Sequence, residues 1–564
     1  MAKIKPLPND VVQLIAAGEV IDSLGAVVRE LAENAIDAGA TRIHIDINPS
    51  LWKIRVADNG HGMDLEDLEL CATPHSTSKI GDRHDLAHIS SLGFRGEALY
   101  SIAQVAHLSI ASCTAGDTGY LLNAHQDKIS TASLHPMSVG SIVTVEHLFA
   151  NFPVRRNALP SLQQQLKTIQ QIIFHLALCY PKLTWQVNQP KGSWFQIAAG
   201  ETALDILPQL LKSLAPQDLV YRRFTHAELP LLEEHCALEL VVGLPDRCHR
   251  HQPDWLKLAV NGRIVKFPLL EHSIIKAFYR TLPRDRHPVC FAHLHLPPEQ
   301  IDWNRHPAKS EIYLQHQARW QDVIKEAIAR TLRLSKANLP KLENQRVLDL
   351  MIAAEPKAEY TVTPKKAVQI TTTNIDLKII GQSRNTYILV EHKAGIWLVE
   401  QHIAHERVIF EQIQEKWQII PSSSPVILGD LSAKQLEQLT ENLGLTLEPF
   451  GENLWKVTTI PAALQTYPDL EAALFELADG GDLGTAQAVI ACRTAVKNGT
   501  PLRQEVMADI INHWQQTKNP HTCPHGRPIY LSLEETSLYR FFRRHWVLGK
   551  SHGITETKSS KIDY

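Results

Sequence analysis

Hydrophobic positions follow two different periods along the chain, which predicts a mixture of helices and strands. In the segment "AVVRELAENAIDAGATRIHIDI" the period is first helical and then alternating. The apolar residues at helical spacing are Val27, Val28, Leu31, Ala35 and Ile36. Gly39 is placed to end that helix, and Ile43, Ile45 and Ile47 then alternate with polar residues as in a strand.

The same patterns divide the rest of the chain. The middle third has strand runs, "LKLAVNGRIV" and "HPVCFAHLHL", followed by a helical stretch, "QARWQDVIKEAIARTLRL". Periodicity is lost around 335–375, where Lys, Thr and Pro dominate as in a flexible linker. Order returns with "LKIIGQSRNTYILVEHKAGIWLVEQH", which predicts a hairpin of apolar strands. Because 564 residues are too many for one core, we expect several domains.

Composition narrows the class of protein. Apolar content is 44%, charged content is 21% and the net charge is -3, so nucleic acid would have to be bound by local basic patches. Such patches are Arg155-Arg156, Arg222-Arg223, "YRTLPRDRH" and "RFFRRHWVLGK". Eight scattered cysteines suit reduced thiols. The start of the chain does not read as a signal peptide and no run suits a membrane span, so we expect a cytoplasmic protein.

The first predicted helix has a polar face. Glu30 and Asn34 stand at i and i+4 and share that face. A carboxylate there could orient a water molecule, and an amide oxygen could bind Mg²⁺. A solvated acidic surface would give the same pattern.

Three further segments favour a nucleotide. "IRVADNGHGM" is a strand that ends at Asp58 and is followed by Gly60 and Gly62, which allow close approach of a base. "HSTSKI" supplies hydroxyls and a lysine. "SLGFRGEALYSIA" is a glycine-rich loop that leads into a helix, an arrangement that suits phosphate.

A second set of chemistry-bearing residues lies near the C-terminus. His402 and Glu406 stand at i and i+4, and Cys492 lies in an Ala-rich helical run. Cys523 and His525 occur in "TCPHGRPIYL". Two cysteines, two histidines and a glutamate could bind Zn²⁺. Taken singly, the i,i+4 pair would more often be surface and Cys492 a buried apolar residue.

Together these segments resemble the nucleotide-binding motifs of the GHKL ATPases, which share the Bergerat fold with type II topoisomerases, histidine kinases and a heat-shock chaperone. "RELAENAIDAGA", "DNGHGM", "GFRGEAL" and "LFANFPVRR" are most similar to the MutL mismatch-repair branch. "DWNRHPAKSEIYL" resembles the lysine motif of that branch. The resemblance spans the chain apart from the linker.

The resemblance implies a multidomain α+β protein. Its expected parts are a GHKL (Bergerat) ATPase α/β sandwich at 1–205, a transducer domain at 206–333, a flexible linker at 334–375, and a dimerisation and endonuclease domain at 376–564.

The resemblance also implies roles at the ATP site. Glu30 would be the general base, Asn34 would bind Mg²⁺, and Lys309 of the transducer domain would reach the γ-phosphate. Asp58 would read adenine, with the glycines beside it. The implied ATP-binding residues are Asn34, Asp58, Gly60, Gly62, Thr77, Ser78, Lys79, Gly93, Phe94, Arg95, Gly96, Glu97 and Ala98. The chain departs from the family pattern with Leu24-Gly25-Ala26 in place of Arg-Pro-Ala, and with Arg305 in place of Val.

The C-terminal set is similar to that of the nuclease-bearing members. The implied metal ligands are His402, Glu406, Cys492, Cys523 and His525, and the implied ions are Zn²⁺ and Mn²⁺. Glu400 stands where the family has Asp, which lengthens the carboxylate arm by one methylene and favours Mn²⁺ over Mg²⁺ for nicking. "WQIIPSSSP" offers Gln418 for the family's sliding-clamp segment, at a spacing that looks short.

The sequence therefore predicts an ATP-dependent homodimer that links mismatch recognition by MutS to nicking of DNA, with non-specific phosphate contacts and a nucleoid-associated location. An ATP-gated clamp without nuclease activity is the nearest alternative. A histidine kinase would need a phosphoacceptor helix before the ATP site. A topoisomerase would need an acidic metal motif and a DNA-cleaving Tyr in a separate region.

Overall fold

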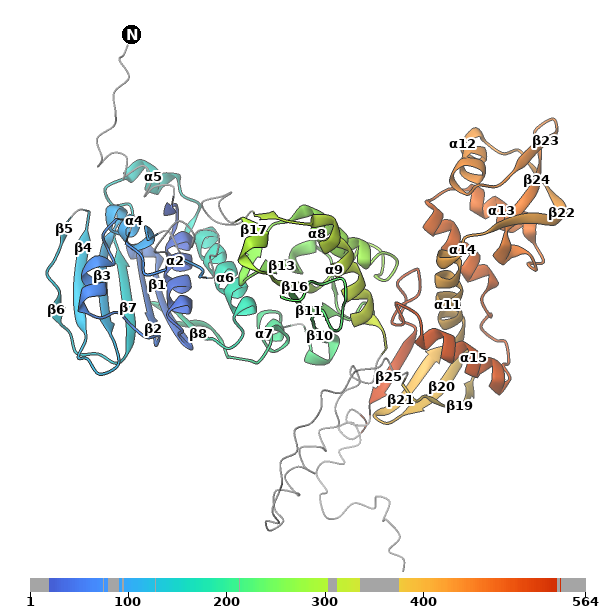
Figure 1. Ribbon diagram of the computed structural model, residues 1–564. Coiled ribbons are helices and arrows are strands. Elements are labelled where there is room, and N and C mark those ends of the chain that lie inside the picture. Colours follow the sequence, from blue (N-terminus) through green and yellow to red (C-terminus); the bar gives the residue numbers. More distant parts are fainter. Residues whose placement is uncertain are drawn as a thin grey trace, which may run out of the picture. The chain divides into compact units, whose positions relative to one another are not determined.

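The chain forms two compact units (Figure 1). The computed structural model describes residues 20–74, 76–79, 91–93, 96–126, 128–212, 214–302, 312–334, 375–534 and 538. The first unit comprises 1–243, 252–277 and 287–331, and the second comprises 244–251, 278–286 and 332–564. In the described residues, no helix is both long and apolar enough to cross a membrane.

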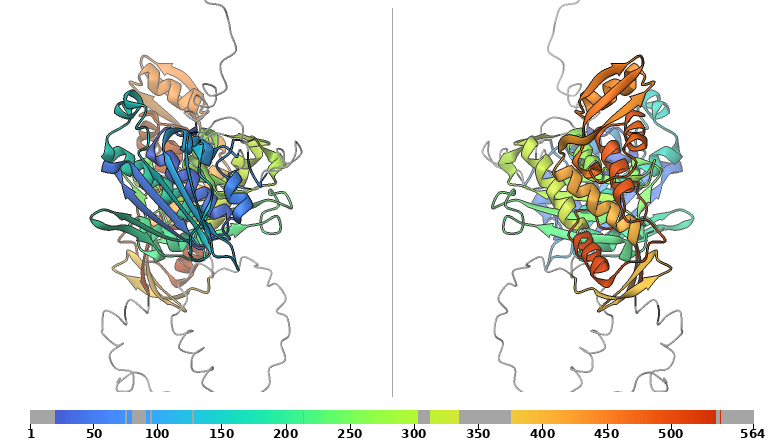
Figure 2. Two further views of the ribbon diagram at one scale, coloured as in Figure 1. Left: turned by 90° about the vertical axis from the view of Figure 1, so that its left-hand side faces the viewer. Right: turned by 90° about the vertical axis from the view of Figure 1, so that its right-hand side faces the viewer.

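The N-terminal part of the first unit is built on a nine-stranded sheet with the order β5-β4-β3-β7-β2-β1-β8-β9 and β6 paired with β4. The left view of Figure 2 looks onto its strands. Its strands are β1 (Arg42–Asn48), β2 (Lys53–Asp58), β3 (His107–Cys113), β4 (Tyr120–His125), β5 (Lys128–Ile129), β6 (Ser133–Leu134), β7 (Gly140–Glu146), β8 (Thr184–Gln189) and β9 (Gly192–Ile197). Ile43, Ile45 and Ile47 of β1 are buried, as their alternation predicts.

Helices pack against this sheet and against one another. They are α2 (Leu24–Asp37), α3 (Leu65–Leu70), α4 (Ala98–Val105), α5 (Pro153–Ala158), α6 (Leu162–Cys179) and α7 (Ala203–Leu210). Helix α2 begins where the Ser23 hydroxyl accepts a hydrogen bond from Ala26 N, a favoured N-cap. Its apolar face is buried and its polar face carries Glu30 and Asn34, which confirms the predicted helix.

The rest of the first unit contains a five-stranded sheet with the order β10-β11-β16-β13-β14. Its strands are β10 (Leu219–Phe224), β11 (Ala237–Gly243), β13 (Leu256–Val260), β14 (Arg263–Val265) and β16 (Cys290–His295). Helices α8 (Pro268–Ala277) and α9 (Gln317–Leu332) accompany it, and short strands form the pairs β12 (His249–Arg250) with β15 (His287–Pro288) and β17 (Ile301–Asp302) with β18 (Tyr313–Leu314). The predicted run "LKLAVNGRIV" is not one strand. It folds back on itself because Asn261 and Gly262 both adopt positive φ, as in a tight hairpin turn.

The second unit begins with an antiparallel sheet, β19-β20-β21-β25. Its strands are β19 (Lys378–Ser383), β20 (Tyr387–His392), β21 (Gly395–Glu400) and β25 (Tyr530–Glu534). The predicted hairpin is therefore confirmed and extended by a third consecutive strand. Helices α11 (Gln401–Glu415), α14 (Leu483–Thr494) and α15 (Gln504–Gln515) follow in the chain, and α11 contacts both of the others.

A second, smaller sheet completes this unit, with the order β22-β24-β23. Its strands are β22 (Ile419–Gly429), β23 (Leu447–Gly451) and β24 (Leu454–Pro461), beside α12 (Ala433–Glu437) and α13 (Leu470–Ala478). Helix α11 joins two cores, because Ile403 and Val408 pack in one and Phe410 and Ile413 in the other. The "WQIIPSSSP" segment runs into β22, which pairs with β24.

Candidate nucleotide site and metal centre

The polar face of α2 gathers two of the predicted nucleotide segments. Asp37, one turn beyond Asn34, accepts hydrogen bonds from Leu92 N and Gly93 N, both at 2.9 Å. The Lys79 ammonium lies 2.5 Å from the Asp37 carboxylate and donates to Asn34 Oδ1 at 3.3 Å. Glu30, half-buried on the same helix, has Arg29 Nε 3.4 Å from its carboxylate. The amide predicted to bind Mg²⁺ therefore lies beside the predicted phosphate loops, on the same helix as the predicted base.

Sequence reasoning assigned no role to Asp37, although its carboxylate holds both loops in place. The available signal was its position, seven residues after Glu30 on the same helical face. Lys79 also occupies space that a metal would need, since it binds both Asn34 and Asp37.

The turn after β2 is shaped by close backbone approach. Asp58 accepts a hydrogen bond from Gly60 N at 2.8 Å, and burial raises the pKa of its carboxyl. Gly62 has φ +73, and a Cβ there would lie 2.1 Å from the Cys113 carbonyl oxygen. A Cβ at Gly60 would lie 2.7 Å from the Ala38 carbonyl oxygen. Only glycine fits at Gly62, where the left-handed backbone and the missing space coincide.

The two predicted lid segments meet at Gly96. This residue has φ +64, and a Cβ there would lie 2.6 Å from the Ser76 carbonyl oxygen. Thr77 Oγ1 accepts a hydrogen bond from Lys79 N at 3.1 Å, and Ser78 stands between these residues in the same segment. Helix α4 begins directly afterwards at Ala98, with Glu97 at the N-cap and no side-chain cap. Phe94, Arg95 and Lys309 lie outside the described residues.

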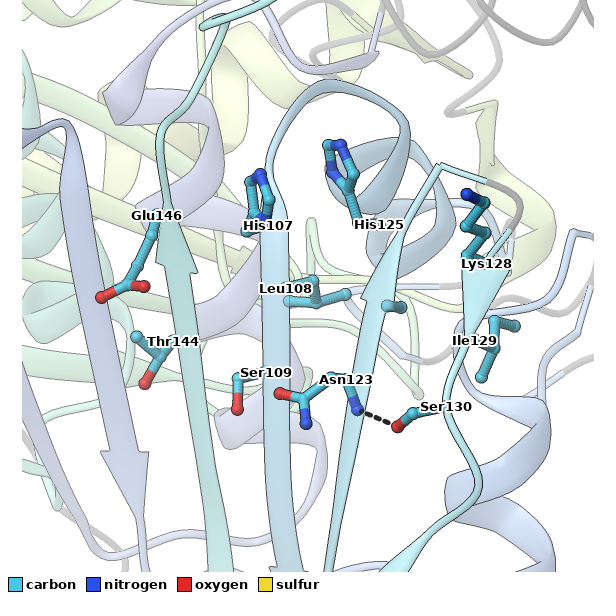
Figure 3. A pocket seen from close by; sticks show the side chains of 11 residues that line it. His107, Leu108, Ser109, Asn123, His125, Lys128, Ile129, Ser130, Thr144 and Glu146 are labelled. Atoms are coloured by element: carbon cyan, nitrogen blue, oxygen red, sulfur yellow. Dashed lines mark hydrogen bonds between the residues drawn. The ribbon is translucent and has the colours of Figure 1, made fainter.

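A hollow of about 490 Å³ lies elsewhere on the first unit (Figure 3). Its lining comes from β3, β4, β5 and β7, and includes His107, Asn123, His125, Lys128 and Glu146. The rings of His107 and His125 stack with their centres 3.9 Å apart. None of the predicted ATP-binding residues lines this hollow, so it is distinct from the candidate nucleotide site.

The candidate metal centre in the second unit is built on α11. Glu406, fully buried on α11, lies 2.9 Å from His525 Nδ1, and Cys523 Sγ lies 4.0 Å from the same nitrogen. Glu406, Cys523 and His525 offer ligand atoms that all lie within 4.8 Å of one another, an arrangement that could hold a metal ion. His402 Nε2, one turn earlier on α11, is 3.7 Å from Cys492 Sγ of α14. All five predicted ligands thus face one or more of the others.

The electrostatics of this cluster favour charged ligands. The Cys523 thiol and the Glu406 carboxylate raise the pKa of His525 to about 9. Burial is the largest single influence and opposes ionisation of both partners, but the hydrogen bonds with His525 and the interactions with Arg527 together lower the pKa of Cys523 and of Glu406. A thiolate and a carboxylate close together suit a divalent cation, and the chemistry of the donor set fits zinc.

Glu400 ends β21 and caps α11. Its Oε2 accepts a hydrogen bond from Ile403 N at 2.5 Å, while its Oε1 is buried with no hydrogen-bond partner among the described residues. A buried carboxylate oxygen without a donor is costly unless something binds it. Glu400 stands two residues before His402 in the chain. Its Oε1 is therefore a candidate ligand for a second cation.

Three positioning residues on α11 were missed by sequence reasoning. Gln401 is completely buried and donates to the backbone oxygens of Asn385 and Lys497. Glu411 accepts the backbone N–H groups of Lys518 and Asn519, and Arg407 donates to Thr522 O. Helix α11 therefore holds the segment that leads into Cys523. Their spacing along one helix carried no distinguishing signal.

Another group of possible ligands, Glu239, His293 and His295, lies on β11 and β16. Arg223 lies 3.4 Å from the Glu239 carboxylate, and Gly262 N donates to His293 Nε2 at 2.9 Å. These interactions already give the Glu239 carboxylate and the His293 imidazole a partner, so the closeness of the three side chains needs no metal ion to account for it.

Comparison with known proteins agrees with this geometry. Residues 22–144 match the model of the histidine kinase-, DNA gyrase B- and HSP90-like ATPases, and residues 220–333 match the C-terminal domain of DNA mismatch repair proteins. Residues 380–502 match the MutL C-terminal dimerisation domain. The DNA mismatch repair protein MutL of Microcystis aeruginosa is 55% identical over 98% of this chain and 99% of its own length. The chain belongs to the MutL family.

MutL proteins of two further organisms are similar over the whole length. That of Rippkaea orientalis is 53% identical, and that of Nostoc punctiforme is 50% identical, each over 98% of this chain and 99% of its own length. The predicted family is thereby confirmed, and so is the order of GHKL ATPase, transducer and dimerisation domains. A full-length match of this kind decides against a histidine kinase or a topoisomerase.

Proposed function

We propose that this MutL-family chain is an ATP-dependent homodimer that couples mismatch recognition by MutS to incision of DNA, and that its C-terminal unit is a metal-dependent nicking endonuclease. The ATPase and dimerisation domains belong to the family. The nuclease rests on one observation, the buried cluster of Glu406, Cys523 and His525 beside α11.

At the nucleotide site, Glu30 acts as general base and Asp58 accepts the adenine amino group. Asn34 holds Mg²⁺, which neutralises charge on the phosphates when ATP is bound. The contacts of Asp37 with Leu92 and Gly93 support this assignment, because they bring the glycine-rich loop against the helix that carries Glu30. Thr77, Ser78, Lys79 and residues 93–98 form the lid, and Lys309 senses the γ-phosphate from the transducer domain.

At the metal centre, His402, Glu406, Cys492, Cys523 and His525 would hold Zn²⁺, and Glu400 would bind Mn²⁺. A metal at this position supplies a Lewis acid that activates water toward a phosphodiester. The chain's own residues supply the charge and the shape: two carboxylates, two imidazoles and two thiols from the end of β21, from α11, from α14 and from the loop that carries Cys523. The carboxylate of Glu400 lies at the start of α11, where its Oε2 accepts a hydrogen bond from Ile403 N.

The remaining features of the proposal concern organisation and partners. We place the ATPase domain at 1–205, the transducer domain at 206–333, the linker at 334–375 and the dimerisation domain at 376–564. DNA would be bound through phosphate contacts that weaken with salt. A cytoplasmic, nucleoid-associated location and contact with the sliding clamp belong to the same proposal. The Gln418 segment is an unfavourable clamp site, since Ile419 and Ile420 already pack against a core.

Nicking of closed-circular DNA by the full chain with Mn²⁺ tests the nuclease. The parent protein should nick, and Glu406→Gln should not, because the buried cluster loses a charged ligand. Glu441→Gln, an exposed glutamate of the same unit, serves as the matched control and should nick at the parent rate. ATP hydrolysis in all three, with no nicking by the parent, would instead support an ATP-gated clamp without nuclease activity. The unpartnered oxygen of Glu400 favours the nuclease over that second candidate.

A further inference from the structure

Arg263, at the start of β14, connects the five-stranded sheet to the candidate nucleotide site. Its guanidinium lies 2.7 Å from the Glu33 carboxylate of α2 and also donates to the Leu92 carbonyl oxygen. The side chains of Arg263 and Glu33 are 9% and 3% exposed, so the pair is almost fully withdrawn from water. Glu33 lies directly before Asn34, and Leu92 directly before Gly93.

The turn before Arg263 is held rigidly. Asn261 exchanges two hydrogen bonds with the Leu296 backbone, both at 2.8 Å, and Gly262 N donates to His293 Nε2. Gly262 has φ +84, and a Cβ there would lie 2.0 Å from the Tyr180 hydroxyl oxygen, just past the end of α6. The hairpin tip therefore fits closely against the helical side of the nucleotide domain, and its geometry fixes where Arg263 can reach.

We propose that Arg263 is a positioning residue through which the transducer domain holds the phosphate-binding loop of the ATPase domain. The inference rests on the proposed role of Gly93 and its neighbours in binding ATP. Both backbone polar groups of Leu92 are then hydrogen-bonded to side chains. Asp37 accepts a hydrogen bond from its N–H, and Arg263 donates one to its carbonyl oxygen. Because Arg263 joins the two, a movement of the β13–β14 hairpin displaces the loop that contains Leu92, and a movement of that loop displaces the hairpin.

Arginine suits this task because both contacts are made by Nη2, whose two N–H groups are held at fixed angles by the planar guanidinium. Lysine would keep the positive charge opposite Glu33. Its ammonium group lacks the planar guanidinium that directs an N–H group at the Leu92 carbonyl oxygen. The substitution Arg263→Lys therefore separates the ion pair from the contact with Leu92. Removing the arginine altogether would leave Glu33 as an uncompensated buried charge, which destabilises the fold itself.

The test is equilibrium binding of a non-hydrolysable ATP analogue to the full chain, together with the hydrolysis rate at saturating ATP and the unfolding midpoint. For Arg263→Lys we expect the dissociation constant to rise about tenfold, because the loop is no longer organised before the ligand arrives. The saturated hydrolysis rate should stay within about twofold, since bound ATP restores the loop. Arg319→Lys is the matched control and should change neither quantity, because Arg319 of α9 likewise contacts a carboxylate, that of Glu233, and donates to a backbone oxygen, that of Leu231.

A second variant keeps the test valid if Arg263→Lys fails to fold. The double substitution Glu33→Gln/Arg263→Met removes both buried charges together and should fold while showing the same weakened binding. Unchanged analogue binding in either folded variant overturns the inference. A parallel fall in affinity, hydrolysis rate and unfolding midpoint also overturns it, because Arg263 would then be merely structural. Failure of the proposed ATP site is recognised separately, by Glu30→Ala hydrolysing ATP at the parent rate.

Discussion

The candidate nucleotide site and the candidate metal centre are assembled in opposite ways. At the nucleotide site, loops from distant parts of the chain are held to α2 by side chains, above all the Asp37 carboxylate and the Lys79 ammonium. At the metal centre, the ligands come from two packed helices and a short loop that is closed by its own backbone hydrogen bonds. Those bonds run from Cys523 N to Arg527 O, from Gly526 N to Cys523 O and from Ile529 N to His521 O.

This difference fits two different tasks. A site that must open and close during an ATP cycle benefits from contacts that a ligand can replace, and Lys79 on Asn34 is one such contact. A hydrolytic metal site benefits from ligands held in place before the metal binds. We therefore expect substitutions at the metal centre to abolish their function, and substitutions around the nucleotide to give graded effects.

The largest expected effect is at Cys523. Cys523→Ser replaces a soft thiolate by a hydroxyl that does not ionise at neutral pH, and it should eliminate both bound zinc and nicking. Elemental analysis of the purified chain and the closed-circular DNA assay would measure this. Cys71→Ser, at a half-buried cysteine of the first unit, is the control. Nicking at the parent rate by Cys523→Ser would remove this thiol from the site.

Glu30→Ala should reduce the rate of ATP hydrolysis by roughly 10²- to 10⁴-fold, as expected when a general base is lost. Binding of the ATP analogue should remain close to that of the parent, because among the described residues Glu30 makes no contact with the loops, only one with Arg29. Asn34→Ala should instead weaken binding of Mg²⁺-ATP. Steady-state hydrolysis together with titration calorimetry distinguishes the two. Equal loss of binding in both variants would contradict the division of roles.

Gly62→Ala should weaken ATP binding at least tenfold, since the added methyl group meets the Cys113 carbonyl in a left-handed backbone. Gly39→Ala is a control with the same left-handed conformation but open space around the new methyl group. If both variants bind the analogue equally well, close packing of the turn is unimportant for the ligand.

Lys309→Ala should leave analogue binding largely intact while removing ATP-induced compaction. The physical reason is that a lysine brought from a second domain can report whether a γ-phosphate is present. Small-angle scattering with and without the analogue gives the measurement. Compaction of the same size in parent and variant would exclude Lys309 from the coupling.

The smallest effect is expected for Glu400→Asp. Aspartate is a favoured N-cap residue, so the shorter side chain can still cap α11. Nicking with Mn²⁺ should stay equal or rise, and nicking with Mg²⁺ should gain more, because Mg²⁺ is the stricter ion. Loss of nicking in Glu400→Asp, with α11 still folded by circular dichroism, would show that the longer reach is required.

Much of this arrangement could be predicted from the sequence. The helical and alternating periods predicted α2 and β1, and the motif resemblance predicted the family and pointed to the candidate sites. What escaped prediction depends on contacts between segments far apart in the chain. Asp37 gathers the loops, Arg263 reaches across from another sheet, and Glu411 holds the segment before Cys523. No local pattern reveals such partners, because the sequence around an Arg or Glu does not show whether the fold will bury that side chain or expose it.

Hydrogen exchange of the full chain, measured with and without the ATP analogue and with and without Zn²⁺, tests the contrast between the two sites most directly. The amides of Cys523, Gly526 and Ile529 should exchange slowly before any metal is added, because they bond to backbone oxygens within the loop at 521–529. Residues 76–79, 96 and 97 should exchange quickly without nucleotide and slowly with it. If 521–529 exchange as quickly as the nucleotide loops until Zn²⁺ is added, the metal centre is not preassembled and the contrast is wrong.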